Sequence, residues 1–220
     1  RCRSRDRVCA GDRFGRHVTQ SGLFTAPLAL LSGERGEVTY YADFLPPALA
    51  DAAFATLREG VDWHAQRRVM YEREVDVPRL TAHFALDAIG GSDTPRGIAR
   101  EGAAIVRDIA ARVTHALGAP FNSVGLNFYR DGNDSVAPHN DRLQDLVEGE
   151  PIALVSLGGT RRMMIRSKCR GEPAVPIDLE AGSMLVMSHA SQLHYTHGVA
   201  KTRAAVGPRI SLALRVRPRG

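Results

Sequence analysis

Hydrophobic residues in the first half of the chain recur at the period of an α-helix. Four apolar residues between positions 49 and 61 stand four apart: Leu49, Ala53, Leu57 and Val61. This spacing predicts a helix with one apolar face over about residues 45–61, and two prolines at its start suit a first helical turn. A longer helix is predicted over about residues 97–117, with Gly118 as its stop signal. Its apolar residues have the same spacing: Ile105, Ile109, Val113 and Leu117.

The pattern changes from Asn122 onward to short runs rich in β-forming residues, separated by turns. These runs are SVGLNFYRDG, IALVSLGG, RRMMIRS, AVPIDLEAG, SMLVMSH, LHYTHGVA and PRISLALRVRP. Two earlier runs also predict strands, EVTYYADF from Glu37 and VPRLTAHFAL from Val77. Helices first and many short strands afterwards predict an α+β fold. The strand series has the size of an eight-stranded jelly roll (a double-stranded β-helix), which the N-terminal helices would buttress.

Composition fits a single globular domain with a basic extension. The chain has 220 residues, of which 44% are hydrophobic and 24% charged, so it is long enough to bury a core. Its formal net charge is +5, which favours polyanions such as nucleic acid without requiring them. Much of this charge lies in the first twenty residues. We therefore expect a basic tail over residues 1–34 and one domain over residues 35–220.

Cysteine use and hydropathy indicate a cytoplasmic protein, which we expect to be a monomer. The three cysteines, Cys2, Cys9 and Cys169, form no C-x-x-C pair, and an odd count argues against a disulfide scaffold. No run is long enough to span a bilayer. The run GLFTAPLALLSG imitates a short signal peptide, but it contains Pro27 and lacks a clear cleavage site. We read it as a docking segment, with a secretory signal as the alternative.

A histidine and an aspartate two residues apart are candidate metal ligands. His139 and Asp141 follow a predicted strand, and in extended backbone this spacing sends both side chains to one side. Two histidines and one carboxylate form the ligand set of mononuclear iron(II) oxygenases. An isolated H-x-D is a weak signal, and a capped surface turn is the alternative. Three later histidines could complete a site: His189, His194 and His197.

Two arginines in an otherwise apolar strand point to an anionic ligand. Arg209 and Arg215 share one face of the run PRISLALR and have no obvious acidic partner in the sequence. An unpaired buried guanidinium is costly, whereas a dicarboxylate between the sheets would match its hydrogen-bonding geometry. Asn127 and Tyr129, another pair on one face of a strand, offer neutral donors for the same ligand.

Taken together and in order, several segments resemble the AlkB group of Fe(II)- and 2-oxoglutarate-dependent dioxygenases. These segments are NFYRDGNDSVAPHND, IALVSLGGTRRMMIR, LEAGSMLVM, QLHYTHGVAK and GPRISLALR. Upstream, VPRLTAHF is similar to the strand that leads into that group's nucleotide-recognition lid. The resemblance extends from about Val38 to Arg217. It implies a lid over about residues 62–97 and a jelly-roll core over about residues 121–217.

The resemblance also implies roles for single residues. It assigns the iron to His139, Asp141 and His197, because the run HGVAK matches the group's H-x-V-P-K segment. It places the distal carboxylate of 2-oxoglutarate on Arg209, and Arg215 near Asp141 and the metal-bound end of the cosubstrate. The full cosubstrate set implied is Asn127, Tyr129, Arg209, Ser211 and Arg215. Many members have asparagine where this chain has Ser211, so one hydrogen bond to the cosubstrate is expected either to have a shorter reach or to run through water.

The implied activity is oxidative removal of N-alkyl groups from DNA or RNA bases. Oxidation of 2-oxoglutarate to succinate and CO2 accompanies hydroxylation of the alkyl carbon, which then leaves as an aldehyde. A base in a duplex cannot reach such a site, so it would be flipped out. Two alternatives remain open. One is an AlkB-like oxygenase that acts on RNA, a protein or a small molecule, and the other is a nucleic-acid-binding module without turnover.

Substrate recognition is where the chain departs from the AlkB pattern. Arg142 stands near a position where AlkB proteins commonly carry an acid, so it would repel a cationic methylated base and could meet a phosphate instead. The hairpin LGGTRRMMIRSK is either an edge that follows the phosphate backbone or a charged, soluble sheet edge. The substrate-binding candidates are His83, Phe84, Arg142, Arg161 and Arg162.

Overall fold

The computed structural model describes residues 26–70, 73–89 and 95–219, without the side chains of residues 66–70 and 73–76. Within these residues, two antiparallel sheets face each other. The large sheet contains, in spatial order, β1 (Leu28–Leu31), β2 (Val38–Tyr41), β10 (Met184–Met187), β7 (Ile152–Gly158), β12 (Arg209–Arg215), β5 (Ser123–Tyr129), β4 (Arg73–Ala85) and β3 (His64–Met70). The small sheet contains β6 (Val136–His139), β11 (Tyr195–Val199), β8 (Arg161–Ser167) and β9 (Val175–Leu179). The predicted α+β jelly roll is confirmed.

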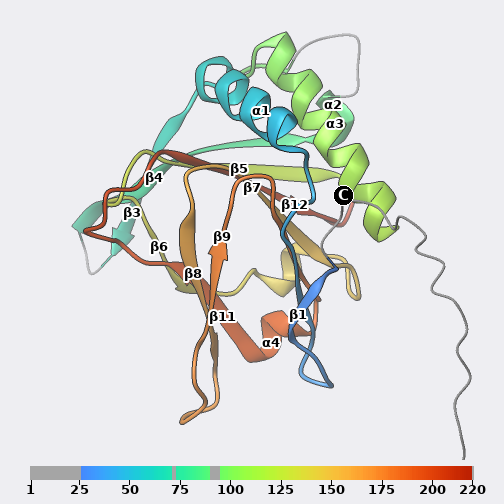
Figure 1. The fold of residues 1–220 in the computed structure, drawn as a ribbon, viewed down its shortest axis with the longest axis vertical. Helices are drawn as coiled ribbons and strands as arrows, with labels where there is room; N and C mark the ends of the chain where they lie inside the picture. The colour runs from blue at the N-terminus through green and yellow to red at the C-terminus, as the bar shows by residue number, and fades with distance from the viewer. Residues whose placement is uncertain (1–25, 71–72, 90–94, 220) are drawn as a thin grey trace, which may run out of the picture.

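Helices cover one face of the large sheet, and the small sheet lies on the other face (Figure 1). α1 (Pro47–Gly60) packs on β7 and β12 and contacts α3 (Arg100–Leu117). Both predicted helices are confirmed within a few residues. Gly118 ends α3 in the left-handed conformation, at φ 67°, and donates its N–H to the carbonyl of Thr114. The short elements are α2 (Leu86–Ile89), α4 (Ser191–His194) and a 3-10 turn at Leu143–Asp145.

The buried face of α3 differs from the predicted one. Val106 is fully buried together with Ile109 and Val113, whereas Ile105 and Leu117 are only partly buried. Residues spaced four apart drift by about 40° per step around a helix of 3.6 residues per turn. Val106 lies at the centre of the buried stripe and Ile105 lies about 100° from it around the helix, off the stripe, whereas Leu117 is on the stripe but is the last residue of α3.

β12 shows how the sheet separates core from site. Its even-numbered residues, Ile210, Leu212 and Leu214, belong to the core under the helices. Because successive side chains of a strand alternate between faces, Arg209 and Arg215 point to the other side, between the two sheets. The predicted sharing of one face by these two arginines is confirmed.

The ordered sheet begins inside the segment expected to be a basic tail. Residues 1–25 lie outside the described part of the chain. Leu28–Leu31 form β1 and pair with β2, and Leu30 and Leu31 pack on the core between the sheets. Their apolar character explains why this end of the segment joins the fold. The expected lid contains β3, β4 and α2, and its residues 71–72 and 90–94 are also outside the described part.

Two further observations concern the whole fold. No helix among the described residues is long and apolar enough to cross a membrane. Cys169 is an exposed free thiol near the start of the β8–β9 connection, whereas Cys2 and Cys9 lie outside the described residues.

Candidate functional site

A cavity of about 1070 Å³ lies between the inner face of the large sheet and the small sheet. β5 and β12 supply one wall, and β6, β8 and β11 supply the other. Most of the predicted site residues line it: His83, Asn127, Tyr129, His139, Asp141, Arg142, His197, Arg209, Ser211 and Arg215. Phe84, Arg161 and Arg162 do not.

Two histidines from distant parts of the sequence meet on the wall formed by the small sheet. His139 on β6 is directly opposite His197 on β11, and their ring centroids are 4.5 Å apart. Nδ1 of His139 lies 2.9 Å from the carbonyl oxygen of Ala137. Because a carbonyl only accepts, Nδ1 donates, so in the neutral ring the lone pair is on Nε2, which is the arrangement of a metal-binding histidine.

His197 is held in its neutral form. Its side chain is deep in the fold, with 5% of the residue exposed. Burial and then the charge of His139 lower its pKa to about 3, because both disfavour the protonated ring. A neutral imidazole is the form that binds a metal.

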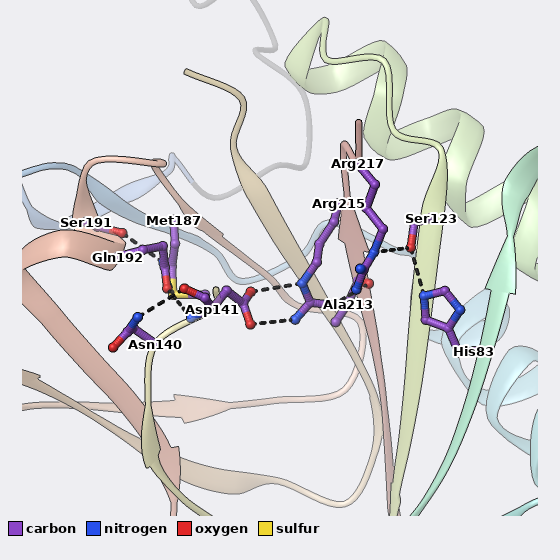
Figure 2. A network of polar contacts seen from close by, with 10 residues as sticks. All are labelled: His83, Ser123, Asn140, Asp141, Met187, Ser191, Gln192, Ala213, Arg215 and Arg217. Atoms are coloured by element: carbon purple, nitrogen blue, oxygen red, sulfur yellow. Dashed lines mark hydrogen bonds and ion pairs between the residues drawn. The ribbon is translucent and has the colours of Figure 1, made fainter. Parts of the chain in front are cut away.

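Asp141 lies beside this pair, but its carboxylate faces Arg215 (Figure 2). Nε of Arg215 donates to one carboxylate oxygen at 2.9 Å, and Nη2 donates to the other at 3.0 Å. Burial raises the pKa of Asp141, but Arg215 outweighs it and, with smaller contributions from His197 and His139, holds that pKa below its ordinary value. The carboxylate is therefore ionised. The acidic partner of Arg215, which was not obvious from the sequence pattern, comes from 74 positions earlier and is the residue near which the resemblance to the AlkB group placed Arg215.

The three residues are not arranged as a complete metal site in this structure. Among the described residues, no three His, Cys, Asp or Glu side chains are close enough together to hold a metal ion. The structure brings His139 and His197 together and places Asp141 nearby with both oxygens on Arg215.

Arg209 has the character of an anion-binding group. Only 1% of the residue is exposed, its Nη2 donates to Oγ of Ser156 at 2.8 Å, and its guanidinium lies 5.2 Å from the ring centre of Tyr129. Its Nε is the one buried side-chain nitrogen or oxygen in the described part of the chain without a hydrogen-bond partner. Such a group is costly unless a ligand completes its bonding, so the site fits a carboxylate.

Asn127 is engaged by a residue that the sequence reasoning missed. Nε of Arg79 donates to Oδ1 of Asn127 at 2.7 Å, and Asn127 is directly opposite Ser211 across β5 and β12. Arg79, Thr81 and His83 all line the cavity from β4. Their spacing of two along a predicted strand was the signal that could have identified Arg79.

The two lid candidates have different environments. His83 lines the cavity, and its Nε2 forms a hydrogen bond of 2.9 Å with Oγ of Ser123, which also accepts one from Nε of Arg217 (Figure 2). Phe84 is 7% exposed and packs into the core under the helices. Because its ring faces the core, Phe84 is not available to stack on a base in this structure.

Neither arginine at the start of β8 faces the cavity. Arg161 is 3% exposed and donates 2.8 Å hydrogen bonds to the carbonyl oxygens of Asp131, Asp134 and Ala200. Arg162 makes two hydrogen bonds to the exposed carboxylate of Asp178. Arg161 therefore ties the loop before β6 to the end of β11, and Arg166, further along β8, is the arginine of this strand that lines the cavity.

Comparison with known proteins identifies the family. The sequence model of the 2OG-Fe(II) oxygenase superfamily matches residues 37–215. The chain belongs to this superfamily. Membership implies Fe(II) as the metal, with 2-oxoglutarate and dioxygen as cosubstrates.

Its relatives include AlkB homologues. Over 117 residues the chain is 35% identical to human DNA oxidative demethylase ALKBH2, a match that covers 50% of this chain and 44% of that protein. It is 28% identical over 208 residues to human alpha-ketoglutarate-dependent dioxygenase alkB homolog 3, covering 91% and 72% respectively. The match thus spans less than half of ALKBH2. The solved structure of OsALKBH1 has the same fold, with a TM-score of 0.53 at 16% identity over 84% of this chain and 99% of that one. The chain is an AlkB-like member of the superfamily.

Proposed function

We propose that this protein is a dioxygenase that removes N-alkyl groups from nucleic-acid bases and releases an aldehyde, succinate and CO2. The observation that carries the proposal is the cavity itself. It combines two adjacent histidines, His139 and the neutral His197, with a buried guanidinium, Arg209, whose hydrogen bonding is incomplete. A metal and a carboxylate ligand account for both features together.

The proposed iron ligands are His139, His197 and Asp141. The histidines fit because His139 keeps Nε2 free and His197 is uncharged. Asp141 fits because an ionised carboxylate has about four lone-pair sites, so the two hydrogen bonds from Arg215 do not exhaust it. When bound, Fe(II) supplies the chemistry that couples oxidation of 2-oxoglutarate to insertion of oxygen into a C–H bond.

The protein's own side chains bind the cosubstrate and hold the proposed metal ligand Asp141, and its two sheets surround the place of reaction. Arg209 binds the far carboxylate of 2-oxoglutarate through a charged hydrogen bond inside a dry site, with Tyr129, Asn127 and Ser211 around it. Arg215 keeps the carboxylate of Asp141 ionised despite its burial. The two sheets flank the cavity in which the alkyl carbon reacts.

A nucleic-acid substrate is supported by the charges around the cavity. Five cationic side chains besides Arg209 and Arg215 line it: Arg79, Arg142, Arg166, Lys201 and Arg217. Among its described lining residues, only Asp141 and Asp145 are acidic, and Asp141 is already paired. Such a lining attracts a phosphate backbone. The name of the ALKBH2 relatives, DNA oxidative demethylase, agrees with this substrate class.

A second candidate is the same chemistry on a protein or a small molecule. The observation that favours it is Arg142, which is exposed and lines the cavity directly after Asp141. A cation there opposes the positive charge of 1-methyladenine and 3-methylcytosine.

The test is incubation with Fe(II), ascorbate, 2-oxoglutarate and oxygen, followed by mass spectrometry of DNA and RNA oligonucleotides that carry 1-methyladenine, 3-methylcytosine or 1-methylguanine. Loss of the methyl group with matching formaldehyde and succinate supports dealkylation. Succinate without any change in the oligonucleotides favours the second candidate. Absence of succinate in every mixture would favour a binding module without turnover and contradict both.

A further inference from the structure

The backbone at Asp141 is fixed by a side chain instead of a strand. β6 and its pairing with β11 end at His139, two positions before Asp141. The N–H of Asp141 donates to Oε1 of Gln192 at 3.0 Å, across 51 positions of sequence. This contact holds the loop at the point where the proposed carboxylate ligand leaves the sheet (Figure 2).

Gln192 is itself held rigidly. Only 1% of the residue is exposed, and its Nε2 donates to Oγ of Ser191 at 3.1 Å, beside Sδ of Met187 at 3.9 Å. Oγ of Ser191 in turn donates to the carbonyl oxygen of Ser188 at 2.7 Å. The amide orientation follows from this chain of bonds, because a backbone N–H can face only the oxygen end of the amide.

The position of Gln192 connects two parts of the site. It lies on α4, between β10 and β11, five positions before His197. Its amide therefore joins the loop that carries Asp141 to the segment that leads into the strand of the second histidine. Hydrogen bonds behind a metal ligand fix its orientation, and their loss typically lowers metal affinity about 10–100-fold.

We propose that Gln192 is a positioning residue for Asp141: its amide oxygen holds the backbone of the loop so that the Asp141 carboxylate can reach the metal held by His139 and His197. This inference rests on the proposed function. Gln192 does not contact the metal, and it acts through the backbone N–H of Asp141 alone. The ion pair between Asp141 and Arg215 does not replace this contact, because it fixes the end of the side chain and not the loop.

The experiment measures Mn(II) binding to the metal-free full chain by calorimetry, with the thermal midpoint recorded for each variant. Gln192→Met keeps the length of the side chain and removes the acceptor, and it is expected to weaken Mn(II) binding about 10–100-fold. Gln192→Glu restores an oxygen at the same place and is expected to recover most of that loss. Gln144→Met, the same substitution at an exposed position three residues beyond Asp141, is the matched control and is expected to bind like the unmodified protein.

The outcomes separate this inference from the function on which it rests. If the unmodified protein binds Mn(II), His139→Ala does not, and Gln192→Met binds as tightly as the control, the positioning role is wrong and the metal site stands. Equal weakening in the Met and Glu variants also overturns it. If the unmodified protein binds no Mn(II), both proposals fail. If Gln192→Met does not fold, Gln192→Asn takes its place, because the shorter side chain moves the same amide away from the N–H of Asp141. Unchanged Mn(II) affinity in that variant would overturn the inference.

Discussion

Arg215 and Asp141 form a two-point ion pair that links β12 to the loop after β6. Both side chains are mostly buried, with 16% and 12% of their surfaces exposed. Removing one partner of a buried pair leaves an uncompensated charge. In Arg215→Met the buried carboxylate of Asp141 loses its counter-charge, and we expect the free energy of unfolding to fall by about 3 kcal/mol. Urea unfolding of the metal-free protein measures this loss.

The control for this prediction is the double variant. Arg215→Met combined with Asp141→Asn removes both charges, so its loss should be clearly smaller than the sum of the two single losses. Additive losses would mean that the two residues stabilise the fold independently.

The proposed ligands predict a sharp division among the histidines. His139→Ala, His197→Ala or Asp141→Ala should abolish succinate production while the circular dichroism spectrum stays unchanged. His194→Ala should keep much of it, because His194 is on α4 and does not line the cavity. Full activity of the Asp141 variant would show that a different group completes the site.

Arg209 is predicted to act on the cosubstrate alone. Hydrogen bonds to charged groups contribute about 1.5–3 kcal/mol, so Arg209→Met should raise the KM for 2-oxoglutarate about tenfold to a hundredfold. Arg162→Met is the matched control, because Arg162 is exposed and pairs with Asp178 away from the cavity. An unchanged KM for 2-oxoglutarate in the Arg209 variant would show that Arg209 does not bind the cosubstrate.

Two arginines of β8 are predicted to have opposite roles. Arg161→Met should lower the free energy of unfolding by about 2–3 kcal/mol, since three backbone carbonyl groups lose the hydrogen bonds of a buried, charged donor. Arg166→Met should leave stability nearly unchanged and reduce the salt dependence of oligonucleotide binding by about one unit of slope. Fluorescence anisotropy over a salt series measures the second effect, and an unchanged slope would contradict a phosphate contact.

Arg142 is predicted to set the preference between charged and neutral lesions. Arg142→Glu replaces a cation next to Asp141 with an anion, so it should raise the ratio of kcat/KM for 1-methyladenine to that for 1-methylguanine. Arg142→Gln should give an intermediate ratio. An identical ratio in all three proteins would place Arg142 outside the range of the bound base.

Local sequence patterns were enough to predict the fold and one wall of the site. The alternation of β12 predicted that Arg209 and Arg215 share a face, whereas β6, the strand that contains His139, was not predicted. Contacts between distant segments could not be predicted in this way. Arg161 looked like a surface cation, because the carbonyl groups that bind it belong to residues 27 to 39 positions away. Gln192 was missed for the same reason, since its partner is 51 positions away.

The most direct measurement is an anomalous-difference map at the iron absorption edge, from crystals grown without oxygen in the presence of Fe(II) and 2-oxoglutarate. We predict a single strong peak within bonding distance of Nε2 of His139, a ring nitrogen of His197 and a carboxylate oxygen of Asp141, with 2-oxoglutarate extending from it to Arg209. A peak elsewhere, or one that lacks Asp141 as a ligand, would contradict the account.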